Sequence, residues 1–204
     1  MVGTILPIVY GDRQQGKRPV SLWLHTLGYV IGGAAVGGMF GVIGAALPVH
    51  RLHIERGLVA LLVTGSICLL YSLRELHLVD IPTPQFYRQV PETWRFHFQP
   101  KVAALLYGLG LGVGLATRIP VSTFYAVVLW AVLVGSPPLG MLGMAIFGFG
   151  RALPLLCAVP FLDDSEAAVR FQSLNRLKPA VQVLNGIALG FAGPCLLAVA
   201  LMRH

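Results

Sequence analysis

The chain has 204 residues, of which 56% are hydrophobic and only 11% are charged, and its mean hydropathy is +0.76. A soluble domain usually carries about 25% charged residues, so this composition excludes a large water-soluble core and indicates a polytopic membrane protein. The net charge of +7 does not indicate a nucleic-acid partner, because the basic residues lie between apolar runs, where they orient helices in the bilayer.

In chain order, the sequence alternates apolar segments with polar loops. Residues 1–10 are apolar but too short to span a bilayer, and they lack the basic region and apolar core of a cleavable signal peptide. Backbone groups in lipid must be satisfied within their own segment, and the two-residue alternation of barrel strands is absent, so we expect helices. The predicted full spans are Ser21–Pro48, Gly57–Leu76, Val102–Val134, Pro138–Leu162 and Val181–Met202.

The predicted fold is therefore an all-α polytopic membrane protein with five full spans and a half-span at the N-terminus. We expect one transmembrane domain over residues 1–204, with a cytoplasmic linker at 77–100 that is rich in prolines and aromatic residues. Half a helix would leave backbone groups unpaired in lipid. We therefore expect the true start of the protein to lie upstream of Met1.

The lysines and arginines are distributed unevenly between the loops. One side of the membrane collects most of them, whereas the other side holds only Arg51, Arg56 and Arg203. Loops rich in Lys and Arg stay in the cytoplasm. The sequence thus predicts a multi-pass protein of the bacterial inner (plasma) membrane whose basic loops are cytoplasmic and whose C-terminus lies outside.

A Thr-x-x-Pro break occurs twice, as "GTILP" at residues 3–7 and as "ATRIP" at residues 116–120. A glycine-rich span and then a third span follow each break. Three helices per unit place the two units in opposite orientations, which predicts an inverted repeat of residues 1–76 and 101–204. Broken helices in such repeats lie at the functional centre, and a proline within a helix frees a carbonyl there. Two unrelated proline kinks are the alternative.

On these motifs, the chain resembles the CcdA family and the transmembrane domain of DsbD, and the resemblance covers essentially the whole chain. It is strongest over the segment "LLYGLGLGVGLATRIPVSTFYAVVLWAVLVGSPPLGMLGMAIFGFGRALPLL". The resemblance implies two inverted three-helix repeats. In the family, the first helix of each repeat carries a Pro-Cys-x-x-Pro-like break, and its cysteines carry electrons across the inner membrane to periplasmic thioredoxin-like proteins.

Both motif cysteines of the family are replaced in this chain. The resemblance places Thr4 and Thr117 at the cysteine positions and Gly3 and Ala116 at the first prolines. A thiolate attacks a disulfide because it ionises at moderate pH, and a threonine hydroxyl does not. The family's electron relay therefore cannot run through these two positions.

The broken helices are the predicted site for a substrate or cargo, formed by Thr4, Pro7, Thr117, Arg118 and Pro120. A cation at membrane depth is costly and is usually paired or turned towards water. Arg118 lies beside Thr117, at a break whose free N–H groups favour anions. We therefore expect an anion or a polar cargo there. Alternatively, Arg118 extends to the membrane interface.

Further candidate sites each have a structural alternative. His50 and His53 are spaced to share a helix face and could hold a metal, or they form a polar helix end. Cys68 and Cys195 occupy similar places in the third helices of the repeats and could be a redox pair, or they pack as small apolar residues. Arg151 is expected to neutralise a carbonyl end or to contact lipid headgroups. The glycine runs at 32–44 and 108–114 are expected to permit close helix contacts.

Three functions follow from the sequence. The first is a non-redox relative of CcdA, acting as an accessory subunit or assembly factor of a membrane or periplasmic redox complex. The second is a transporter of a small ion or solute through the broken helices, and the third is a thiol-disulfide electron carrier that uses Cys68 and Cys195. We expect no catalytic residue and no cofactor, and we expect the bilayer and a membrane or periplasmic protein as partners.

Overall fold

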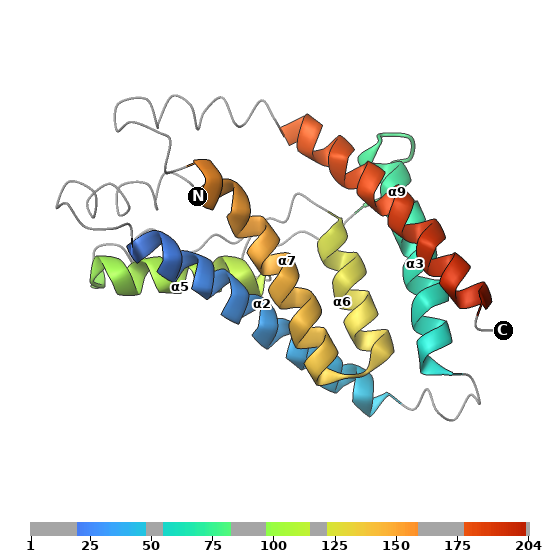
Figure 1. Ribbon diagram of the computed structural model, residues 1–204, viewed down its shortest axis with the longest axis horizontal. Helices are drawn as coiled ribbons and strands as arrows, with labels where there is room; N and C mark the ends of the chain where they lie inside the picture. Colours follow the sequence, from blue (N-terminus) through green and yellow to red (C-terminus); the bar gives the residue numbers. More distant parts are fainter. Residues whose placement is uncertain (1–19, 48–54, 83–96, 115–121, 159–177, 203–204) are drawn as a thin grey trace. The chain divides into compact units, whose positions relative to one another are not determined.

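A computed structural model describes residues 20–47, 55–82, 97–114, 122–158 and 178–202 of the chain. The described part consists of helices joined by short turns, and no strand occurs in it. Figure 1 shows the helices along the chain. They are α2 (Val20–Ala46), α3 (Arg56–Glu75), α5 (Pro100–Val113), α6 (Thr123–Val134), α7 (Pro137–Ala158) and α9 (Lys178–Met202).

Four of these helices, namely α2, α3, α7 and α9, are long and apolar enough to cross a membrane. An α-helix rises 1.5 Å per residue, so the 20 residues of α3 extend over about 30 Å, the thickness of a hydrocarbon core. Large apolar side chains on these helices are exposed, and Phe191 on α9 is 72% exposed. Such side chains are stable where lipid covers them. The chain is thus a multi-pass membrane protein, as the sequence predicts.

The third predicted span, Val102–Val134, is two shorter helices in the structure. Helix α5 has 14 residues and α6 has 12, so neither alone is long enough to cross a bilayer. The predicted interruption at Arg118 and Pro120 falls in 115–121, between them and outside the described residues. The half-span at 1–10 also lies outside them, and five full spans and the inverted repeat stay predictions.

Local sequence signals explain where these helices begin and end. Helix α5 begins at Pro100, in the first turn, where the missing N–H of proline costs no hydrogen bond. It ends at Gly114, whose φ of 71° lies in the left-handed region that glycine adopts without strain. Gly135 ends α6 in the same way, with a φ of 62°.

The end of α3 is closed by a turn with two reversed hydrogen bonds. The N–H of Leu78 donates to the carbonyl oxygen of Leu73 at 2.9 Å, and the N–H of His77 donates to that of Arg74 at 3.0 Å. This is the pattern of a Schellman motif. Its left-handed position, usually a glycine, is taken by His77 with a φ of 59°. The turn directs residues 78–82 back past the end of the helix.

The chain divides into two compact units, each drawn from three stretches of sequence. The first unit comprises Met1–Ala35, Phe86–Arg118 and Ala145–Leu177, and it contains the first half of α2, all of α5 and the second half of α7. The second unit comprises Val36–Gln85, Ile119–Met144 and Lys178–His204, and it contains α3, α6 and α9.

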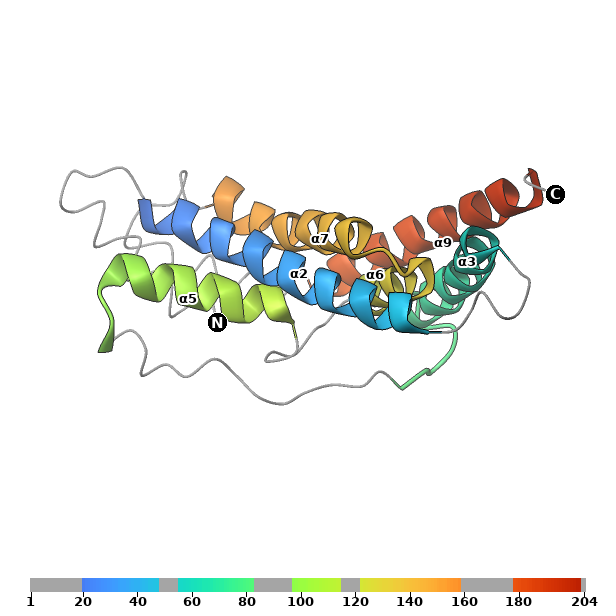
Figure 2. The same cartoon turned by 90° about the horizontal axis from the view of Figure 1, so that it is seen from below.

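In the first unit, α2 and α5 lie side by side (Figures 1 and 2) because glycines remove the side chains between them. A Cβ atom built on Gly28 or Gly32 of α2 would meet the backbone of α5 at less than 3.0 Å. A Cβ on Gly108 or Gly112 of α5 would meet the backbone of α2 in the same way. Each helix thus presents a G-x-x-x-G pair to the other. These findings confirm the predicted close contacts of both glycine runs.

In the second unit, α3 packs against α9 and α6, and α9 runs alongside α3 in both views (Figures 1 and 2). Gly65 of α3 and Gly193 of α9 approach each other closely: a Cβ on Gly193 would lie 3.0 Å from the carbonyl oxygen of Gly65. Apolar contacts continue along the same helices, where Cys68, Ala126 and Leu189 form one buried cluster. This three-helix group contains the polar site described below.

Candidate functional site

The residues predicted to bind a cargo or a metal cannot be placed. All of them lie outside the described residues, so both predictions stay untested. They are Thr4, Pro7, His50, His53, Thr117, Arg118 and Pro120.

The three cysteines are described, and each is a free thiol. Cys68 is only 4% exposed and packs against Ala126 and Leu189, whereas Cys195 is exposed on α9 and Cys157 is exposed on α7. Reactive cysteines usually lie in partly exposed, electropositive surroundings, and the apolar cluster around Cys68 is not of that kind. The redox role of Cys68 and Cys195 stays a prediction.

Arg151 on α7 is bound to the end of another helix in the first unit. Its Nη1 donates to the carbonyl oxygen of Leu111 at 3.3 Å, in the last turn of α5, and its guanidinium carbon lies 5.7 Å from the centre of the Tyr29 ring. Carbonyls in the last turn of a helix lack a partner within the helix. The structure thus confirms that Arg151 neutralises a carbonyl end.

The second unit contains a buried carboxylate that sequence reasoning did not select. Glu75 is the last residue of α3 and is 1% exposed. Its Oε1 accepts hydrogen bonds from the backbone N–H of Ser122 at 2.8 Å and from the Ser122 hydroxyl at 2.5 Å. The Nη1 of Arg74 lies 3.3 Å from the same oxygen and forms an ion pair with it. Arg74 also donates to the Ser122 hydroxyl at 2.9 Å.

Glu75 thereby caps the helix that follows the second Thr-x-x-Pro break. Ser122 is the N-cap residue of α6, and it makes no capping bond with its own side chain. The first N–H groups of a helix lack partners and carry partial positive charge, so a carboxylate there is favourable. The anion that the sequence predicts at the break itself would lie at residues 116–120, outside the described residues. At Ser122, the N–H group is bound by the carboxylate of Glu75.

Further polar side chains join the three helices of this unit. The Ser72 hydroxyl donates to the carbonyl oxygen of Gly186 at 2.7 Å, which links α3 to α9. The hydroxyl of Thr123 on α6 is hydrogen-bonded to the side-chain oxygen of Asn185 on α9. The Nδ2 atom of Asn185 and the hydroxyl of Thr64 are buried without a partner among the described residues. Buried polar atoms without a hydrogen-bond partner are rare in native protein interiors.

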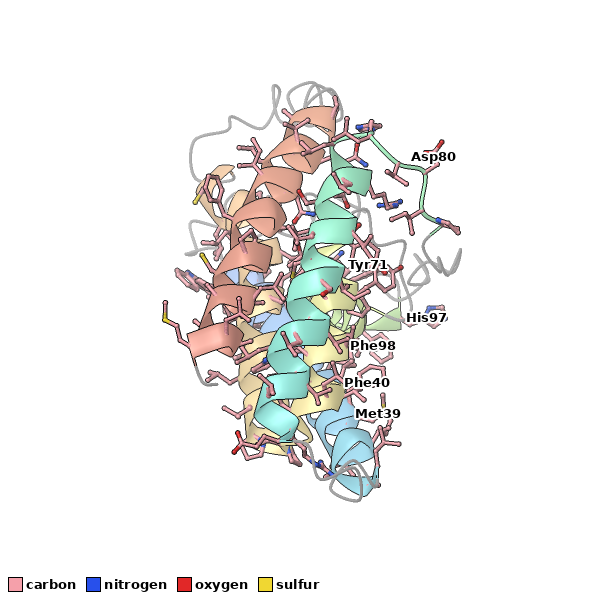
Figure 3. The ribbon with its side chains drawn as sticks, turned by 90° about the vertical axis from the view of Figure 1, so that its right-hand side faces the viewer. Met39, Phe40, Tyr71, Asp80, His97 and Phe98 are labelled. Atoms are coloured by element: carbon pink, nitrogen blue, oxygen red, sulfur yellow. The ribbon has the colours of Figure 1, made fainter. Side chains whose placement is uncertain are left out.

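A cavity of about 390 Å³ opens at the end of α3, next to Glu75. Its wall includes the final turn of α3, the segment that follows, and Gln182 of α9. Figure 3 shows Asp80 on the segment beyond the end of α3, with Tyr71 further back on the helix. The Nε of Arg74 donates to the carbonyl oxygen of Ile81 at 2.8 Å, which holds this segment in place. The lining residues are Arg74, Glu75, His77, Asp80, Ile81, Pro82 and Gln182.

The side chains around the cavity can form hydrogen bonds and ion pairs. Within the described residues, no group of three or more His, Cys, Asp or Glu side chains is arranged to hold a metal. Glu75 carries no strong signal in the sequence, because an ionisable residue marks a site by default within a membrane span, whereas Glu75 is the last residue of α3. Its partner Ser122 carries no signal either, since it is 47 residues away in the chain.

Comparison with known proteins identifies relatives of the chain. The profile of a family described as "Cytochrome C biogenesis protein transmembrane region" matches residues 1–192. Three curated relatives, each named methylamine utilization protein MauF, are 30%, 32% and 34% identical to the chain; they come from Methylophilus methylotrophus, Paracoccus versutus and Paracoccus denitrificans.

The alignments cover most of this chain but a smaller share of each relative. In the same order, they include 89%, 92% and 73% of the chain, and they span 61%, 68% and 54% of the relatives' own length. No solved structure is significantly similar to the chain.

Proposed function

The chain belongs to the cytochrome c biogenesis protein transmembrane family, and on this premise we propose that it is a non-redox accessory subunit or assembly factor. It serves a membrane or periplasmic redox complex from within the bacterial inner membrane, with its basic loops in the cytoplasm and its C-terminus outside. In this proposal the chain catalyses no reaction itself.

The replacement of both motif thiols carries the proposal. Thr4 and Thr117 stand where the family resemblance expects the two cysteines of the relay. A threonine hydroxyl neither ionises at moderate pH nor exchanges with a disulfide. The surroundings of Cys68 support the same reading, because this thiol is enclosed by apolar side chains. In this proposal, the chain has lost the family's relay and acts by binding a protein partner in the membrane.

The names of the relatives suggest which complex the chain serves. The curated relatives are called methylamine utilization proteins, and we extend this process to the chain. The redox complex then takes part in methylamine utilization, and the chain contributes to its assembly or anchoring rather than to its chemistry.

Purification from native membranes in mild detergent tests this proposal. Mass spectrometry of the purified material identifies co-purifying proteins and their stoichiometry. We expect a membrane or periplasmic protein of a redox complex to co-purify with the chain in stoichiometric amounts. Recovery of the chain alone, from membranes of cells grown on methylamine, would contradict it.

Two alternatives make different predictions. If the chain transports a small ion or solute through its broken helices, Arg118→Ala abolishes flux and leaves folding intact. If it is a thiol-disulfide carrier, Cys68→Ser or Cys195→Ser abolishes function. If the chain is an accessory subunit, Arg118→Ala should abolish no flux, and the cysteine substitutions should leave its function intact.

A further inference from the structure

We infer that the chain neutralises both helix ends of its interrupted third span with its own side chains, so that neither end holds an ion from solution. The ends are the last turn of α5, in the first unit, and the first turn of α6, in the second unit. The counter-charges are Arg151 and Glu75. This inference goes beyond the accessory role, because it concerns how the two short helices are held rather than which protein the chain binds.

Short helices that end inside a membrane protein expose charge. The first N–H groups of a helix carry a partial positive charge, and its last carbonyls carry a partial negative charge. In transporters with discontinuous helices, such ends hold anionic substrate groups and sodium ions. Helix α5 has 14 residues and α6 has 12, so each is too short to cross a bilayer. The end of α5 and the start of α6 therefore both need a counter-charge.

Neither helix carries this counter-charge in its own sequence. The last turn of α5 contains no basic residue, and the first turn of α6 contains no acidic residue. The N-cap residue of α6, Ser122, makes no capping bond with its own side chain, although serine is among the best capping residues. Both ends thus depend on charge from elsewhere, which is either an ion or a side chain of another helix.

In the first unit, Arg151 of α7 supplies the positive charge. Its Nη1 donates to the carbonyl oxygen of Leu111, in the last turn of α5, at 3.3 Å. The rings of Tyr29 and Phe147 lie 5.7 Å and 5.9 Å from its guanidinium carbon and add cation–π attraction. The described acidic residues all belong to the second unit. Within the described part of the first unit, the carbonyl end of α5 is therefore the negative group that Arg151 meets.

In the second unit, Glu75 of α3 supplies the negative charge. Its side chain is 1% exposed and Ser122 is 0% exposed, so bulk water does not satisfy these groups. The carboxylate accepts the backbone N–H of Ser122 at 2.8 Å and pairs with Arg74 at 3.3 Å. The carboxylate is thus held by the start of α6 and by a cation at once.

A counter-charge that belongs to the chain differs from a bound ion because it cannot leave. Each helix end is fixed to a neighbouring helix of its own unit, α5 to α7 and α6 to α3. A transporter that works by binding and releasing an ion at such ends needs them vacant in one of its states. Ends that are permanently neutralised form a static joint instead, and the stability of the chain should not depend on which ions are in solution.

The first test measures thermal unfolding of the full chain in an uncharged detergent. At constant ionic strength, sodium is replaced by potassium or lithium, and chloride is replaced by acetate or phosphate. An ion that binds only the folded chain raises the midpoint of unfolding as its concentration rises. We expect no saturable rise with any of these ions.

The second test removes each counter-charge and should create the missing ion dependence. In Glu75→Ala, acetate can bind at Ser122 and Arg74 in place of the lost carboxylate, and it should raise the midpoint by roughly 2–4 °C. In Arg151→Ala, guanidinium should raise the midpoint at concentrations too low to unfold the natural chain. Ser72→Ala is the matched control, because it removes an uncharged hydrogen bond between α3 and α9, and it should respond to neither ion.

Arg151→Lys keeps the positive charge and should gain no dependence on guanidinium. An ion-independent natural chain, together with rescue of at least one alanine variant by the ion of the lost sign, supports the inference. A saturable ion dependence of the natural chain, or rescue of neither variant, would overturn it. The measurements on the natural chain and on Arg151→Ala decide the matter even where Glu75→Ala does not fold. None of them involves a protein partner, so they are independent of the co-purification experiment.

Discussion

The contact between α2 and α5 and the group of α3, α6 and α9 are two solutions to helix packing in lipid. The first brings backbones together by removing side chains at Gly28, Gly32, Gly108 and Gly112. The second joins helices through hydrogen bonds between side chains and backbone, centred on Glu75.

The difference has consequences for function. A backbone contact is filled completely and leaves no room for a ligand. One buried polar group there is His25 on α2, whose Nδ1 lies 3.1 Å from the carbonyl oxygen of Ala104 on α5. The polar group, by contrast, lies beside a cavity that Glu75 lines. Space for a ligand beside buried polar groups thus occurs in the second region.

The largest effect on stability is expected from Glu75→Ala. This change leaves the N–H of Ser122 and the guanidinium of Arg74 without their carboxylate. Removing one member of a buried ion pair costs about 3–5 kcal/mol, and Glu75→Gln should cost less because it can still accept from Ser122. The measurement is the free energy of unfolding in bicelles. A loss below about 0.5 kcal/mol for Glu75→Ala would show that the polar network does not hold this region together.

The backbone contact is tested by Gly108→Ala. The added Cβ would overlap the backbone carbonyl of His25, and overpacking of this kind costs about 1–3 kcal/mol. Gly150→Ala on α7 is the matched control, because a Cβ there meets nothing within 4 Å. The control should be neutral or stabilise α7 by up to about 1 kcal/mol. Equal effects of the two substitutions on thermal unfolding would refute the close contact of α2 with α5.

A smaller effect is expected from Ser72→Ala, which removes the hydrogen bond between α3 and Gly186 of α9. A single hydrogen bond contributes about 0.5–1.5 kcal/mol. Ser66→Ala is the control on the same helix, because the Ser66 hydroxyl donates only to Leu62 within α3, and its effect should be near zero. If both variants unfold at the same denaturant concentration, the link between the helices adds nothing to stability.

The smallest effect is expected from Thr64→Val. The Thr64 hydroxyl is buried and has no partner among the described residues, so a methyl group in its place removes no hydrogen bond. We expect the stability to be unchanged or slightly raised. A clear loss, measured as a lower midpoint of thermal unfolding, would indicate a partner for this hydroxyl.

Much of the fold could be predicted from the sequence, because length and hydropathy determine which segments can cross a bilayer. Helices α2, α3, α7 and α9 begin and end within a few residues of the predicted spans. Hydropathy alone gives the third predicted span, Val102–Val134, as one run, although the sequence also predicts a break at residues 116–120, and the structure describes two helices there. Gly114 and Pro120 carried that signal locally, and α5 ends at this glycine.

The site was harder to predict than the fold. The sequence directed attention to the two Thr-x-x-Pro breaks and to Arg118, which lie outside the described residues. It did not bring Glu75 to Ser122, since a hydrogen bond across 47 residues depends on tertiary packing rather than on any local pattern. The role of Arg151 was easier to predict, because an arginine within an apolar helix needs a nearby acceptor. A carbonyl at the end of α5 supplies this acceptor.

The central claim is that this member of the family functions without a thiol relay. The most direct test replaces Cys68, Cys157 and Cys195 together by serine in the native chromosomal copy. Growth of this strain on methylamine is then compared with that of the parent and of a deletion strain. The account predicts that the deletion strain fails to grow and that the cysteine-free strain grows at the parental rate. Failure of the cysteine-free strain, with the chain present in the membrane at normal levels, would contradict it.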